Sequence, residues 1–337
     1  MKKQLSMAMA GAFVALGVSV ASAGTLDTVK QRGQLICGSN AGLAGFGIPN
    51  EQGKWAGFDV DYCRALAAAV LGDADKTKYV PLSAKDRFTA LQSSEIDVLP
   101  RNTTWTLTRE TGGFLFAATN YYDGQAFMVK KSLGVNSAKD LDGATICVQQ
   151  GTTQELNLSD YFRTLGKKYQ ILTVATIGEA QNAYEGGRCD AFTSDASQLY
   201  GVRLALKAPE EHVVLPEIIS KEPLAIAVRQ GDDQWFNIAK WVYYALVQAE
   251  ESGVTQANVD EMLKSDKPDI KRLLGTEGDF GKQLGLDNQW AYRAIKQVGN
   301  YGEIFDRNLG SQSKLKIERG LNALWTNKGL QYAPPIR

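Results

Sequence analysis

Short apolar runs and longer amphipathic stretches alternate along the chain. A short apolar run predicts a buried strand, and apolar residues at a helical spacing predict a helix that covers a sheet. In the first half, the pattern predicts in order strand 34–40, helix 59–72, strand 78–83, helix 86–94 and strand 96–100. This βαβαβ order predicts a parallel sheet with helices on its faces.

The same alternation then begins again. The pattern predicts in order strand 144–150, helix 152–166, strand 169–176, helix 178–187, strand 189–195 and helix 196–206. The third strands of the two halves are alike, since each has a turn, an aspartate, an apolar run and then polar residues. We therefore expect an α/β protein with two lobes of similar build.

Two further apolar runs connect the predicted lobes. Residues 121–131 lie between the two alternating halves, and residues 223–230 precede a long amphipathic helix. The chain would thus leave the first lobe, build the second and return. Open α/β sheets bind ligands at the carboxyl ends of their strands, so two facing sheets predict a cleft with a hinge. We expect residues 24–124 in the first lobe, 125–221 in the second, and 222–337 back in the first with a helical C-terminal extension.

The N-terminus has the pattern of a secretory signal peptide. Lys2 and Lys3 precede an apolar run at 7–20, which is too short to span a bilayer, and Ala-Ser-Ala follows at 21–23. We expect residues 1–23 to be cleaved and the protein to reach the periplasm. No later run of the sequence has the length of a transmembrane helix, so we expect no membrane insertion.

Charge, cysteine and histidine content narrow the possible functions. Without the signal peptide, 35 basic and 37 acidic side chains remain, and this near-neutral balance argues against nucleic acid as a partner. The four cysteines, which an oxidising compartment allows to pair, leave three disulfide pairings open, and four buried thiols are the alternative. The single histidine, His212, is expected at the surface or at a strand edge.

Polar residues follow three of the predicted strands. Arg109 stands at the start of a helix after the polar run RNTTWT, and its planar guanidinium suits a carboxylate, although it could equally be a surface arginine. Gly151 and Thr152 lie between a strand and a helix, where free N–H groups bind anions, although an ordinary helix cap is the alternative. Asp195 ends a strand, either as a counter-charge for an ammonium group or as a helix cap. Together these groups complement a zwitterion, and the simplest such ligand is an α-amino acid.

Four segments resemble one family in the same order. They are GFDVDYCRALAAAV (57–70), T-x-x-R (106–109), QGTTQE (150–155) and RCDAFTSD (188–195). They are similar to the bacterial extracellular solute-binding proteins of family 3, the polar amino acid receptors of ABC importers. The length of the chain and the sequence of its segment 101–110 are most similar to those of the long receptors for general L-amino acids, or for glutamate, glutamine, aspartate and asparagine. The resemblance covers roughly residues 30–250.

The resemblance implies a two-lobe periplasmic binding protein of type II with its ligand held between the lobes. It implies that Arg109 binds the ligand α-carboxylate, with help from the backbone N–H and hydroxyl of Thr153. Asp195 would bind the α-ammonium, with the Thr104 hydroxyl and a backbone group of Asn102 nearby.

Four more residues are candidates for the ligand side chain. Many relatives carry an aromatic lid where this chain has Leu43, so an aromatic sandwich is in doubt here. Arg87 and Arg101 are extra cations near the expected pocket, and either could meet an acidic side chain. Gln150 could bind an amide or simply end its strand.

We expect an L-amino acid ligand, an ABC permease of the inner membrane as partner, and a monomer. We expect neither catalytic residues nor a cofactor or metal. Two alternatives stay open: a dehydratase-like periplasmic enzyme on the same scaffold, using Asp195 or Glu155 as acid or base, and a sensor subunit with the same binding chemistry.

Overall fold

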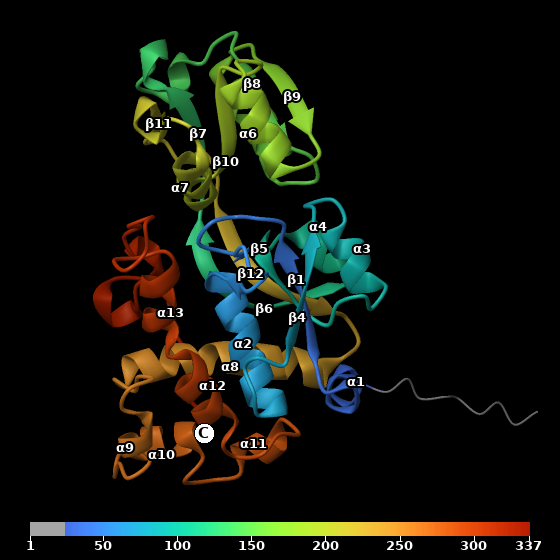
Figure 1. Ribbon diagram of the computed structural model, residues 1–337, viewed down its shortest axis with the longest axis vertical. Coiled ribbons are helices and arrows are strands. Elements are labelled where there is room, and N and C mark those ends of the chain that lie inside the picture. Colours follow the sequence, from blue (N-terminus) through green and yellow to red (C-terminus); the bar gives the residue numbers. More distant parts are fainter. Residues whose placement is uncertain (1–23) are drawn as a thin grey trace, which may run out of the picture.

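The computed structural model describes residues 24–337 and shows two lobes stacked along the long axis (Figure 1). The predicted signal peptide, residues 1–23, lies outside the described residues. Within the described part of the chain, no helix combines the length and the apolar character needed to cross a membrane.

The first lobe contains a mixed sheet. Its strands are β1 (Leu35–Asn40), β4 (Thr77–Leu82), β5 (Leu99–Thr104), β6 (Phe114–Asp123) and β12 (Glu222–Arg229), with a small hairpin of β2 (Ile48–Pro49) and β3 (Trp55–Ala56). Strand β1 pairs in parallel with β4, and a parallel bridge from Cys37 to Val98 leads on towards β5. The returning strand β12 lies antiparallel between β5 and β6. Its helices are α1 (Thr25–Arg32), α2 (Phe58–Leu71), α3 (Arg87–Gln92), α4 (Leu107–Thr111) and α8 (Asp233–Glu251).

The second lobe is one five-stranded sheet in the order β11-β7-β10-β8-β9. Its strands are β7 (Gln125–Lys130), β8 (Thr145–Gln149), β9 (Gln170–Val174), β10 (Ala191–Asp195) and β11 (His212–Val214). Its helices are α5 (Gln154–Leu165), α6 (Ile177–Glu185) and α7 (Ala196–Ala205), and the short 3-10 turns are η1 (Lys131–Leu133), η2 (Ala138–Asp140) and η3 (Pro209–Glu211). Strand β8 pairs in parallel with both β9 and β10. Strand β7 pairs antiparallel with both β10 and β11.

The two-lobe α/β architecture is as predicted, but three details differ. Both lobes contain antiparallel as well as parallel pairs. The antiparallel strands are β7, on which the chain enters the second lobe, and β12, on which it returns to the first. The predicted strand 121–131 is two strands, β6 and β7, that meet at Gly124. The polar run that was expected after a strand is in part the strand itself, since β5 continues through Thr104. Thr103 and Thr104 pair with Ala225 and Leu224 of β12, and this pairing extends the strand into the polar run.

Two disulfides resolve the pairing that the sequence left open. Cys37 on β1 bonds to Cys63 on α2, and Cys147 on β8 bonds to Cys189 just before β10. Each bond ties a strand to a neighbouring element of its own lobe. His212 begins the edge strand β11 as expected, but it is buried and not at the surface. Its Nδ1 lies 2.7 Å from the hydroxyl of Tyr184.

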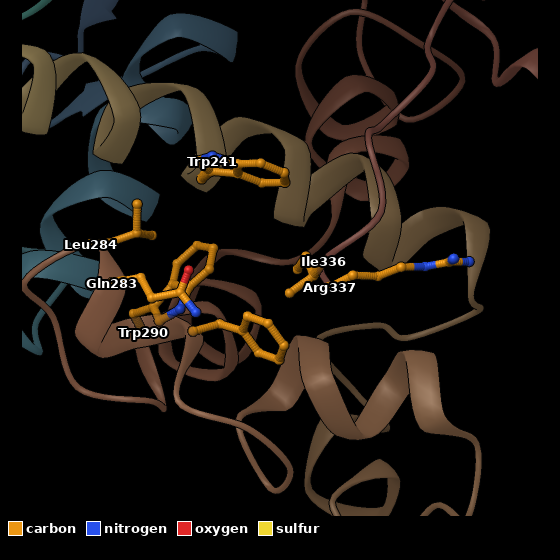
Figure 2. Close-up of a pocket in the computed structure, with 7 residues that line it drawn as sticks. Trp241, Gln283, Leu284, Trp290, Ile336 and Arg337 are labelled. Carbon is orange, nitrogen blue, oxygen red and sulfur yellow. The ribbon is translucent and has the colours of Figure 1, made fainter.

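The C-terminal extension packs onto the first lobe. It contains α9 (Val259–Met262), α10 (Pro268–Leu274), α11 (Phe280–Gln283), α12 (Trp290–Val298), α13 (Tyr301–Asn308), η4 (Gly320–Asn322) and η5 (Trp325–Asn327). Helices α12 and α13 pack on both α2 and α8, and α10 packs on α8 (Figure 1). Arg307 pairs with the buried Asp61 of α2 at 2.7 Å, and the Asn322 amide bonds the backbone N–H and C=O of Tyr122 on β6. The final residues cover α8, where Trp241, Trp290 and Ile336 line a small pocket (Figure 2).

Candidate functional site

A narrow cavity lies between the two lobes, where strands of both sheets end. The first lobe contributes Ala84, Arg87, Arg101, Asn102 and Thr104 to its wall. The second lobe contributes Gln149, Thr152, Thr153, Gln154, Asp195 and Gln198. Six of the nine predicted site residues therefore lie on one cavity, namely Arg87, Arg101, Asn102, Thr104, Thr153 and Asp195.

The lobes touch around this cavity, so the structure is a closed form. The Asn102 amide donates to Gln198 Oε1 across the cleft at 3.0 Å. Gly151 has φ +78° and lies so close to the first lobe that an added Cβ would be 3.0 Å from Cα of Lys85. The backbone of α7 at Gly201 approaches Ala44 in the same way, with 3.0 Å between an added Cβ and the Ala44 carbonyl oxygen. A side chain at either glycine would hold the lobes apart.

A bulge in β5 aims the residues of the first lobe at the cavity. The pairing with β12 shifts register between Thr103 and Leu99, and Asn102 adopts φ +28°. Bulges and left-handed residues re-aim side chains beside binding sites. The conformation is held by the buried Asp59, which accepts the Asn102 N–H at 3.0 Å, and by Asn40, which donates to Asn102 Oδ1 at 3.0 Å. Burial raises the pKa of Asp59 to about 7.

Three arginines surround the first-lobe side of the cavity, and their contacts differ. The Nε of Arg101 donates to the Leu82 carbonyl at 2.9 Å, and burial lowers its pKa to about 10. The Nη1 of Arg109 donates to the Thr104 carbonyl at 2.7 Å. Arg87 is 3 % exposed, makes only long contacts at 3.2 and 3.5 Å, and has no partner for its buried Nε among the described residues. Arg87 therefore carries a buried Nε–H group that no described residue accepts.

Two features of the second lobe face these cations. Asp195 is buried at the start of α7, yet its carboxylate does not cap that helix and instead accepts from the Gln154 amide. Burial, with the negative charges of Asp123 and Glu222, raises the pKa of Asp195 well above its usual range. Thr153 is the N-cap of α5, and its backbone N–H has no partner among residues 24–337. A free helix N-terminus favours an anion, and an uncommitted carboxylate favours a cation.

Three predicted residues lie outside the cavity wall. Arg109 is half-buried beside it, with its guanidinium carbon 5.2 Å from the centre of the Phe88 ring. Leu43 is buried near Gly201 of α7, so it closes the lobe junction and does not line the cavity. Gln150 is exposed, and its neighbour Gln149 lines the cavity in its place, because successive strand residues point to opposite faces.

Sequence reasoning left five polar residues out of the predicted site. Four of them line the cavity, namely Gln149, Thr152, Gln154 and Gln198. Glu222, at the start of β12, is buried and accepts hydrogen bonds from both lobes. Gln149 could have been found from the alternation of side chains along its strand, and Gln154 from its place at the start of the helix that follows. For Glu222, the position before an apolar strand carried no such signal.

Comparisons with known proteins identify the family. The model of the bacterial extracellular solute-binding proteins, family 3, matches residues 35–265. The general L-amino acid-binding periplasmic protein AapJ of Rhizobium johnstonii is 60% identical over 99% of both chains. The glutamate/glutamine/aspartate/asparagine-binding protein BztA of Rhodobacter capsulatus is 56% identical over 97% of both chains.

One solved structure is similar over nearly its whole length. It is an ABC transporter/periplasmic binding protein from Brucella ovis with glutathione bound. Its sequence is 60% identical to this chain, and the TM-score is 0.92. The match covers 94% of this chain and 100% of the Brucella ovis chain. The two-lobe fold therefore extends to the C-terminal helices, which lie beyond the family match.

Proposed function

Because the chain belongs to the bacterial extracellular solute-binding proteins, family 3, we propose that it is the binding subunit of an ABC importer. It captures polar L-amino acids in the periplasm by closing its lobes around them, and it delivers them to an inner-membrane permease. Relatives that are 60% and 56% identical are named as amino acid-binding proteins, and this supports the ligand class. We further propose that the subunit acts as a monomer, with lobe boundaries near residues 124/125 and 221/222.

The observation that carries the proposal is the Asp195 carboxylate, which accepts a hydrogen bond from the Gln154 amide but does not cap its own helix. An aspartate at the N-cap position of a helix ordinarily satisfies that helix. Here the carboxylate faces the cavity, and the free N–H of Thr153 and three arginines lie around the same space. A ligand with an ammonium and a carboxylate on one carbon would satisfy both sides. In this arrangement Asp195 binds the ammonium, and Arg109 with Thr153 binds the α-carboxylate.

The side chain of the ligand would face Arg87. Burial and the charges of Arg109 and Arg101 lower the pKa of Arg87 well below its usual range. A buried cation with a free donor suits a second carboxylate. The Brucella ovis relative has glutathione bound, so acidic amino acids and reduced glutathione belong in the same ligand screen.

A thermal-shift screen of the purified mature protein tests the ligand class. A compound that binds only the folded state raises the Tm by mass action. We expect polar L-amino acids to raise it, and sugars and divalent metal ions to leave it unchanged. Stabilisation by sugars or metals alone would overturn the proposal. Conversion of a bound compound to a product would instead favour an enzyme.

Calorimetry of Arg109→Ala tests the site. Truncating one partner of a desolvated charge pair costs about 2–5 kcal/mol, so we expect affinity to fall by at least about 30-fold. Arg163→Ala is the control, because that arginine lies on α5 with its side chain 76% exposed and paired to Asp160. Near-wild-type affinity in Arg109→Ala would contradict the assigned role.

A further inference from the structure

The buried Glu222 lies where the chain returns from the second lobe to the first. It begins β12, and it is 1% exposed. Two residues further along, Leu224 pairs with Thr104 of β5, so Glu222 belongs to the first-lobe sheet. A buried carboxylate is costly unless hydrogen bonds or a cation compensate the lost hydration.

Four neutral donors surround the Glu222 carboxylate. Its Oε2 accepts from the hydroxyls of Thr104 at 2.6 Å and Thr153 at 2.7 Å. Its Oε1 accepts from the Asn157 amide at 2.7 Å and the Ser220 hydroxyl at 2.7 Å. Each oxygen therefore accepts one hydrogen bond from the start of α5 in the second lobe, from Thr153 or Asn157. Each also accepts one from outside α5, from Thr104 of the first lobe or from Ser220 of the crossing segment.

Direct ion pairing does not compensate this carboxylate. Among residues 24–337, no cation forms a salt bridge with Glu222, although Arg109 lies near enough for its charge to be felt. The carboxylates of Asp123 and Asp195 lie in the same region, and their charges repel that of Glu222. The charge of Glu222 is thus held mainly by hydrogen bonds. Two of these, from Thr153 and Asn157, exist only while α5 lies against the first lobe.

We propose that Glu222 is a positioning residue for lobe closure, which sets the balance between open and closed forms. Separating the lobes removes the Thr153 and Asn157 donors and leaves two. Hydrogen bonds to a charged acceptor are among the stronger ones, so their loss opposes opening. This inference rests on the proposed function, because the protein is proposed to capture its ligand by closing the lobes.

The variant Glu222→Gln tests this while keeping the side-chain shape. An amide has one acceptor oxygen and one donor group, so either orientation turns an NH₂ towards one of the two α5 donors. We expect the closed form to lose about tenfold in population, since one charge-assisted bond is worth at least about 1.5 kcal/mol. Small-angle scattering of the ligand-free variant should give a larger radius of gyration. Stopped-flow measurements with L-glutamine should give about tenfold faster dissociation with little change in association.

Glu217→Gln is the matched control. The Glu217 carboxylate accepts from the Ser137 hydroxyl and from the Ala138 N–H at 3.1 Å, and both partners belong to the second lobe. Wild-type dissociation and scattering in Glu222→Gln would overturn the proposal, as would an equal change in Glu217→Gln.

Asn157→Ala provides a second test should Glu222→Gln fail to fold. It removes one moving donor from outside the cavity wall, and we expect the same expansion and faster dissociation. Wild-type behaviour of Asn157→Ala would count against the proposal. The scattering result needs no ligand, so it separates failure of this inference from failure of amino acid binding by the wild-type protein.

Discussion

Replacing Arg87 should separate acidic from neutral ligands. Arg87→Met keeps the length and apolar stem of the side chain but removes its charge and all its donors. L-Glutamate and L-glutamine have nearly the same shape, but the side chain of glutamate ends in a carboxylate and that of glutamine in an amide. Because Arg87 lines the same cavity as Asp195, and its buried Nε has no partner among the described residues, we expect its guanidinium to bind the second carboxylate of glutamate.

The expected magnitude follows from the contacts. One hydrogen bond between charged groups contributes about 1.5–3 kcal/mol, and a guanidinium can offer two. Arg87 is already buried in the closed form, so a ligand carboxylate adds chiefly its own desolvation to the cost. A net loss of about 2 kcal/mol remains, which is about 30-fold in Kd for glutamate. For glutamine, which a guanidinium contacts only through its carbonyl, we expect less than about threefold.

Isothermal titration calorimetry of both ligands on wild-type protein and Arg87→Met measures the difference. Arg101→Met is the contrasting variant. Its Nε is already bonded to the Leu82 carbonyl, so its loss should reduce stability and weaken both ligands together. Equal weakening of glutamate and glutamine by Arg87→Met would refute the reasoning and assign Arg87 a structural role.

Two further predictions concern protons and disulfides. Since burial and nearby carboxylates raise the pKa of Asp195, its protonated form dominates below that pKa and cannot pair with an ammonium. Amino acid affinity should therefore fall as the pH is lowered through the raised pKa of Asp195. Binding should release protons, as seen by calorimetry in two buffers of different ionisation enthalpy, and a pH-independent Kd would contradict this. Removing Cys147–Cys189, with its separation of 42 residues, should lower the free energy of unfolding by about 4 kcal/mol in urea titrations. A reductant should reproduce that loss in a variant lacking Cys37–Cys63 and have no effect when both bonds are absent.

The local pattern of the chain predicted the elements that build the site. Alternating apolar runs and amphipathic stretches located most strands and helices of both lobes, because burial of one face imposes its period on the sequence. The T-x-x-R segment predicted a helix start, and Thr106 does cap α4 by accepting the Arg109 N–H. Asp195 was found for the same reason, since a strand followed directly by a helix defines where its side chain lies.

Tertiary structure decided what no local pattern contains. The cavity that Gln149 lines exists only because the second lobe meets Arg87 and Arg101 of the first lobe there. The bulge that turns Asn102 arises from pairing between β5 and β12, which are far apart in sequence. Thr104 and Glu222 are separated by 118 residues and still share a hydrogen bond. The sequence alone determined which chemical groups each lobe offers. Which of them meet depends on packing between the lobes, since hydrogen bonds act only over contact distance.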